Sequence, residues 1–137
     1  MKKGMILLIT AAALAFWTGA CSQNQKTAEG AALDWLKLVD AGNYAQSWEC
    51  GATILKHAVA KEQWLQILKD GRAPLGSLTS RELTSAEYQS GLPGAPRGEY
   101  YVIQFTSTFA NRRSVTETVT PMLDKDGRWR VAVYYVK

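Results

Sequence analysis

The chain has 137 residues, with 16 Lys and Arg against 12 Asp and Glu, two Cys and one His. This length suits one domain behind a short leader, and the net charge of +2 that remains without Lys2 and Lys3 is too small for a nucleic-acid-binding surface. The Cys and His residues show no ligand spacing and no glycine-rich phosphate loop follows a strand, so the sequence predicts no metal site and no cofactor.

The first 20 residues have the pattern of an export signal. Lys2 and Lys3 give a positive start, and an apolar run of about a dozen residues follows from Ile6 to Trp17. This run is short for a membrane-spanning helix. If residues 1–20 are removed, 117 residues remain, with 14 basic residues against 12 acidic ones.

The end of this segment, Thr18-Gly19-Ala20-Cys21, resembles a bacterial lipobox, although Thr18 stands where that pattern usually has Leu. The resemblance implies cleavage before Cys21, a lipid anchor on Cys21 and attachment on the periplasmic side of the cell envelope. Ser22 resembles a signal for the outer membrane. The alternatives are an ordinary secretory signal cut after Ala20, which gives a secreted or periplasmic protein, or an uncleaved anchor.

The two cysteines are expected to have different roles. If Cys21 carries lipid, Cys50 has no partner in the chain, so the sequence predicts no disulfide framework. Cys50 falls within a helical pattern and is expected to be a buried small apolar residue. The short polar segment 21–27, with the lipidated Cys at its start, is expected to tether a single domain over 28–137.

Apolar residues recur at helical spacing in three segments, which predicts helices over residues 28–40, 44–59 and 61–72. Each predicted helix carries a Trp on its apolar stripe: Trp35, Trp48 and Trp64. Helices this short need another layer to pack against. Residues 75–88 then predict an irregular strand with a bulge or an edge position, and an open loop spans 92–98.

The last part of the chain predicts three antiparallel strands in sequence. A type I turn with a following glycine at Asp124–Gly127 sets a hairpin register in which three pairs face each other: Leu123 with Trp129, Val119 with Val133, and Glu117 with Tyr135. A three-residue loop at 111–113 pairs Phe109 with Val115. Pro121 has no N–H group, so a bulge or bend is expected there.

These elements predict an α+β fold, with three N-terminal helices packed on one face of a curved four-stranded antiparallel sheet. The order of elements resembles the cone-shaped nuclear-transport-factor-like and cystatin-like domains. Several strings resemble the bacterial domain-of-unknown-function family 4019, among them Trp35-Leu36-Lys37-Leu38-Val39-Asp40-Ala41-Gly42-Asn43-Tyr44, Lys61-Glu62-Gln63-Trp64, Arg72-Ala73-Pro74-Leu75-Gly76 and Asp126-Gly127-Arg128-Trp129-Arg130-Val131. The name of that family records no assigned activity, so the resemblance implies no functional residue.

Glu117 is the one charged residue that the predicted register places on the apolar face. Burial raises the pKa of a carboxyl group, which is how general acids and bases are made, so a small cone-shaped enzyme using Glu117 is one hypothesis. The structural alternative is a pair with Lys137 and the Tyr135 hydroxyl at the end of the sheet. The single histidine, His57, is expected to have a surface role.

The other hypothesis is a non-enzymatic envelope lipoprotein whose domain binds a partner protein or a small apolar ligand. Aromatic and arginine side chains are the usual anchors of such surfaces. Most of the aromatic residues are expected to be core, and the candidates for a pocket or docking surface are Tyr101, Trp129, Tyr134, Tyr135 and Arg130. The expected partners are the membrane, through Cys21, and an envelope protein or small ligand.

Overall fold

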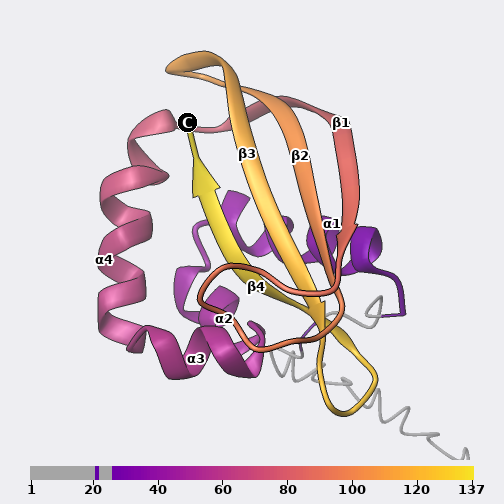
Figure 1. Ribbon diagram of the computed structural model, residues 1–137. Helices are drawn as coiled ribbons and strands as arrows, with labels where there is room; N and C mark the ends of the chain where they lie inside the picture. The colour runs from indigo at the N-terminus through magenta and orange to yellow at the C-terminus, as the bar shows by residue number, and fades with distance from the viewer. Residues whose placement is uncertain (1–20, 22–25) are drawn as a thin grey trace, which may run out of the picture.

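The computed structural model describes Cys21 and residues 26–137. The predicted export signal and most of the predicted tether lie outside the described residues. Within them, helices precede a four-stranded antiparallel sheet of order β1-β2-β3-β4, which confirms the α+β prediction (Figure 1). The elements are α1 Ala28–Asp40, α2 Tyr44–Glu49, α3 Thr53–Ala58, α4 Lys61–Gly71, the 3-10 turn η1 Ala73–Leu75, β1 Leu78–Gln89, β2 Tyr100–Phe109, β3 Arg112–Leu123 and β4 Trp129–Val136.

Helix α1 has the predicted bounds and supplies the central contact with the sheet. The Thr27 hydroxyl accepts a hydrogen bond from the Gly30 N–H at 3.1 Å and caps the start of the helix. The buried stripe of α1 consists of Ala28, Ala31, Ala32, Trp35, Leu36 and Val39, at helical spacing. The apolar periodicity seen in the sequence therefore marks the face that packs on the sheet.

The predicted helix over 44–59 is divided into α2 and α3. Between them, the Ala52 N–H donates to the Val131 carbonyl of β4 at 2.8 Å instead of continuing a helix. Gly51 lies at this break, where an added Cβ would come within 2.6 Å of Leu55 Cδ2. A tertiary hydrogen bond to the sheet edge thus ends one helix and begins the next.

The β2–β3 register differs from the predicted one by two residues. Phe105 pairs with Glu117 and Ile103 with Val119, and the turn is Ala110-Asn111. The predicted three-residue loop that pairs Phe109 with Val115 is wrong, because Phe109 pairs with Arg112. The register shift between Ser107 and Phe109 offsets the two-residue turn, so that the apolar side chains still lie on one face. β1 is an edge strand with two register shifts of its own, as its irregular pattern predicts.

The β3–β4 register is correct at Leu123 and Trp129 but wrong beyond Pro121. Thr120 pairs with Val133 and Pro121 with Val131, so Ala132 is the extra residue of a bulge at the expected proline. The bulge exchanges the two faces of the rest of β4. The predicted pairs of Val119 with Val133 and of Glu117 with Tyr135 are therefore wrong, and Tyr134 rather than Tyr135 lies on the helix side. Val133 and Tyr135 are 36% and 44% exposed, whereas Tyr134 is buried.

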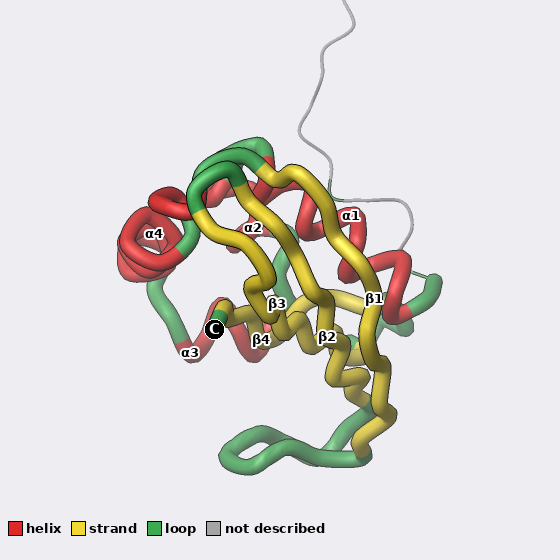
Figure 2. The backbone as a smooth tube through the Cα atoms, turned by 90° about the horizontal axis from the view of Figure 1, so that it is seen from above, coloured by secondary structure: helices red, strands yellow, loops and turns green. Residues whose placement is uncertain are grey.

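The main core lies between the helices and one face of the sheet (Figure 2). The Trp35 ring meets the Tyr134 ring edge-on at 5.2 Å, and the Trp64 ring lies 6.1 Å from Trp35. The indole N–H groups are satisfied inside this layer, since Trp35 donates to the Ser47 carbonyl at 2.8 Å and Trp64 to the Ser47 hydroxyl at 3.0 Å. The helices therefore cover the sheet through buried residues of β2, β3 and β4.

The β1–β2 loop crosses the other face of the sheet, in front of β3 and β4 in Figure 1. It covers a second apolar cluster of Ala52, Tyr100, Met122 and Ala132, with Leu92, Ala95 and Ile54 packed against it. The Tyr100 hydroxyl donates to the Pro96 carbonyl at 2.6 Å and holds the loop in place. No helix among the described residues is long and apolar enough to cross a membrane.

Candidate functional site

Glu117 on β3 is fully buried beneath the helices, and both of its carboxylate oxygens are bonded. One oxygen accepts from the Arg81 guanidinium at 2.8 Å and from the Ser107 hydroxyl at 2.5 Å. The other accepts from the Tyr134 hydroxyl at 2.6 Å. These donors come from β1, β2 and β4, so this one carboxylate joins all four strands.

The ion network continues from Glu117 towards the helices. Arg81 also donates to both oxygens of Asp40, the last residue of α1, at 2.7 and 2.9 Å. Asp40 accepts a further bond from Arg72 at 3.2 Å, and the buried Arg72 guanidinium stacks on the Phe109 ring at 4.2 Å. The alternation Arg–Asp–Arg–Glu therefore ties α1 and the end of α4 to the sheet.

The pKa values of Arg81 and Tyr134 are both raised within this network. Burial alone would lower the pKa of Arg81, but its bonds and charge interactions with Asp40 and Glu117 outweigh burial and raise that pKa. Burial, and then the negative charge of Glu117, raise the pKa of Tyr134. The neighbours thus favour the charged form of Arg81 and the neutral form of Tyr134.

Lys137, the partner expected for Glu117, lies over the Tyr135 ring at 5.7 Å instead. Glu117 has no exposed surface and lines none of the hollows described below. The enzyme hypothesis would require Glu117 to open into a cavity, and it opens into none of these hollows.

The largest of these hollows is a cleft of about 870 Å³ that we call the hairpin cleft. It lies between α3, the β1–β2 loop and the β3–β4 hairpin, and Cys21 also reaches its wall. The side chains of Ile54, Met122 and Leu123 give it apolar surface, while charged residues line the rest. The charged residues are Glu49, Lys56, Arg97, Asp124, Lys125, Asp126, Arg128 and Arg130, and His57 lies beside them.

The acidic residues of the hairpin cleft are already paired. Asp126 accepts two bonds from Arg130 at 2.8 and 2.6 Å, which lower the pKa of Asp126 to about 2. Asp124 accepts from Arg130 at 3.1 Å and from the backbone and hydroxyl of Thr53 at 3.3 Å. Glu49 bonds Lys61 at 2.5 Å, which lowers the pKa of Glu49. The carboxylates around the cleft therefore have cationic partners.

A smaller hollow of about 330 Å³ lies at the start of α1, beside Tyr101 and Trp129. The Tyr101 ring meets the Trp129 ring at 5.5 Å and the Tyr88 ring at 5.6 Å, both edge-on, so three aromatic side chains cross this end of the sheet. The structure thus separates the predicted pocket residues. Tyr101 and Trp129 line this hollow, Arg130 lines the hairpin cleft, Tyr134 is core and Tyr135 lies on the outer face.

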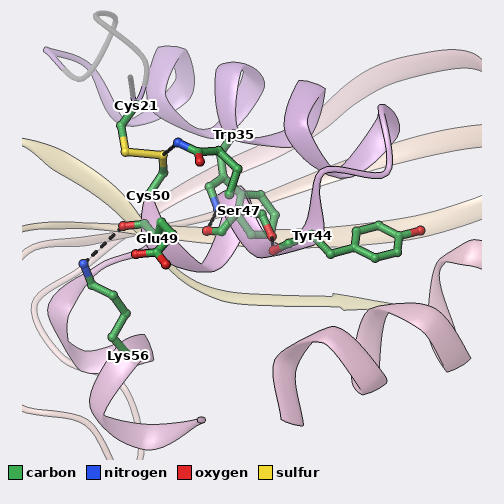
Figure 3. Close-up of a disulfide and its surroundings, with 8 residues drawn as sticks. Cys21, Trp35, Tyr44, Ser47, Glu49, Cys50 and Lys56 are labelled. Carbon is green, nitrogen blue, oxygen red and sulfur yellow. Dashed lines mark hydrogen bonds between the residues drawn. A yellow bond between two sulfur atoms is a disulfide. The ribbon is translucent and has the colours of Figure 1, made fainter. Parts of the chain in front are cut away.

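Cys21 and Cys50 form a disulfide, which the sequence did not predict (Figure 3). Cys50 is 5% exposed at the end of α2, as expected for a buried residue, but the expectation that it has no partner is wrong. One sulfur atom forms either this disulfide or a thioether to lipid, so the two states of Cys21 exclude each other. The cysteine count alone could have indicated the pair, because an oxidising compartment allows it.

Of the predicted site residues, only Cys21 and Arg130 line the hairpin cleft. In an antiparallel meander the β1–β2 and β3–β4 connections emerge at the same end of the sheet, and both carry basic residues, with Arg97 in one and Lys125 and Arg128 in the other. That juxtaposition was available from the sequence. His57 lies exposed at the cleft, and no group of three or more metal-ligating side chains occurs among the described residues.

Comparison with known proteins gives one relationship. No curated protein matches the chain. A family model described as "Protein of unknown function (DUF4019)" matches residues 31–134, from the first turn of α1 to β4. Since this match covers most of the chain and nearly the whole described domain, the chain belongs to the DUF4019 family.

Proposed function

We propose that this chain is an exported, non-enzymatic protein of the cell envelope that binds a ligand in the hairpin cleft. The observation that carries the proposal is the cleft itself. Three segments distant in sequence build it, and its volume of about 870 Å³ falls in the range of small-molecule sites. The export pattern of residues 1–20 supports the envelope location.

Cys21 decides how such a protein is held in the envelope. A thioether to lipid would anchor the chain to the membrane, whereas the disulfide to Cys50 leaves it without that anchor. The intact mass of the mature protein distinguishes the two states, because the first adds a diacylglyceryl group and the second lacks two hydrogens. We propose export for both states.

The alternative function, a small enzyme with Glu117 as general acid or base, gains no support from the geometry. A substrate would have to reach a side chain that is fully buried and bonded to Arg81, Ser107 and Tyr134. A general acid or base must lie within hydrogen-bond reach of the reacting proton. The groups bonded to Glu117 are instead side chains of the protein itself.

A thermal-shift screen of the purified mature chain against pools of small molecules tests the proposed function. Amide chemical-shift mapping then locates every compound that stabilises the protein. We expect at least one compound to shift residues 53–57, 97–98 and 122–128 around the cleft. Compounds that all map elsewhere, or the absence of any stabilising compound, would overturn the proposal.

A further inference from the structure

We propose that the hairpin cleft takes an amphiphilic anion, with a carboxylate or phosphate head group on Arg97, Lys125 and Arg128 and an apolar body on Ile54, Met122 and Leu123. This inference rests on the proposed function and names the chemical class of its ligand. Two features of the cleft lead to it, an excess of positive charge whose side chains form no ion pair with a described residue, and an apolar surface beside that charge.

The excess of positive charge follows from the pairing of the acids. Arg130 bridges Asp124 and Asp126, and Lys61 pairs with Glu49 from outside the cleft. None of the remaining cationic side chains of the cleft forms an ion pair with a described residue: Lys56, Arg97, Lys125 and Arg128. The cleft as built therefore attracts negative charge.

These cations come from three separate segments. Arg97 lies on the β1–β2 loop, Lys125 and Arg128 on the β3–β4 hairpin, and Lys56 on α3, where its ammonium group donates to the Glu49 carbonyl at 3.2 Å. Guanidinium groups present paired N–H donors that match the oxygens of carboxylates and phosphates. A head group between the loop and the hairpin could accept hydrogen bonds from cations on both segments.

The apolar part of the cleft accounts for the second half of the ligand. Met122 is 8% exposed and belongs to the cluster with Tyr100, on which Ile54 also packs. Leu123 is half-buried beside them. An inorganic anion would leave this surface in contact with water, whereas an acyl or alkyl chain would cover it and gain about 0.8 kcal/mol per buried methylene group.

Binding of alkyl probes below their micelle concentrations tests the inference. The probes are decyl phosphate, decanoate, the neutral decyl maltoside and inorganic phosphate, each measured by calorimetry on the mature chain. We expect decyl phosphate and decanoate to bind more tightly than the neutral probe or inorganic phosphate. Equal binding of the neutral probe would contradict recognition of the anion, and equal binding of inorganic phosphate would contradict the apolar half.

The cleft variant is Arg97→Gln with Arg128→Gln, and the matched control is Arg112→Gln with Arg113→Gln at the opposite end of the sheet. All four arginines are exposed, and none forms an ion pair with a described residue. We expect the cleft variant to lose affinity for decyl phosphate about tenfold or more and the control to keep it. Equal losses in both would overturn the inference.

Sedimentation with vesicles separates two sources of the same head-group chemistry. Binding to phosphatidylglycerol vesicles but not to phosphatidylcholine vesicles, together with decyl phosphate binding, supports a lipid head group. Binding to decyl phosphate alone supports a free amphiphile. Vesicle binding without decyl phosphate binding contradicts a cleft ligand. A cleft ligand of another class from the screen, with no alkyl anion bound, overturns this inference and leaves the proposed function standing.

Discussion

Two groups of charged residues differ in whether they are available to a ligand: the network around Glu117 and the residues of the hairpin cleft. The network around Glu117 is buried, and its carboxylates are bonded by arginine and hydroxyl donors. The hairpin cleft is open, and the side chains of Arg97, Lys125 and Arg128 form no ion pair with a described residue. A buried charge has to be paired within the fold, whereas an exposed charge stays available to a ligand.

The two groups have roles opposite to those that their sequence patterns suggest. Glu117 stands out because it is charged among apolar residues, and that pattern favours a catalytic interpretation. The structure shows the same residue as the point where four strands are joined. The basic residues of the two connecting loops, which look like ordinary surface, are the ones that face open space.

The largest expected effect on stability comes from Glu117→Ala. The change leaves the hydroxyls of Ser107 and Tyr134 and one side of Arg81 without their acceptor in the core, and breaking a buried charge pair costs about 3–5 kcal/mol. Urea denaturation measures the loss. The exposed Glu87→Ala on β1 is the control and should change the free energy of unfolding by less than about 0.5 kcal/mol. A loss below about 1 kcal/mol for Glu117→Ala would contradict the structural role.

The next effect is expected from Cys50→Ala. The disulfide closes a loop with a sequence separation of 29 residues, for which the chain-entropy model gives about 3–4 kcal/mol. Reduction of the unmodified protein should lower the free energy of unfolding by a similar amount, and reductant should not change the variant further. If the mature protein instead carries a thioether on Cys21, the substitution will have little effect on stability.

A smaller effect is expected from Tyr134→Phe. The variant loses a hydroxyl bond to a buried carboxylate, worth about 1.5–3 kcal/mol. Because the pKa of Tyr134 is raised in the folded protein, its contribution is fully present below the unfolded-state pKa of about 10 and is lost as the pH rises above that value. Urea midpoints between about pH 8 and 11 should fall less steeply for the variant. Parallel curves would refute this linkage.

Much of the fold follows from periodicity in the sequence. The bounds of α1 and β2 agree with their apolar patterns, and the turn at Asp124–Gly127 fixes the start of the hairpin, with Gly127 at φ 80°. These features are local, because each depends on neighbouring residues along one segment. Pro121 also marked the correct place for a bulge.

The remaining differences arise from contacts between distant segments. A bulge adds one residue to β4, and a single added residue reverses every later side chain, so Tyr134 and Tyr135 exchange faces. The partner of Glu117 is Arg81 on the edge strand, 36 residues away, and no periodic pattern ties the two together. The division of the second helix depends on a hydrogen bond from Ala52 to β4. Contacts between distant segments therefore determine the register of β4, the partner of Glu117 and the division of the second helix.

The central claim is that the buried carboxylate supports the fold while the open cleft binds the ligand. Stability in urea and affinity for decyl phosphate, measured side by side on two variants, test it most directly. We predict that Glu117→Gln lowers stability and keeps affinity, and that Arg97→Gln with Arg128→Gln keeps stability and lowers affinity. The account would be contradicted if Glu117→Gln abolished binding in a protein that is still folded, or if the cleft variant bound as tightly as the original chain.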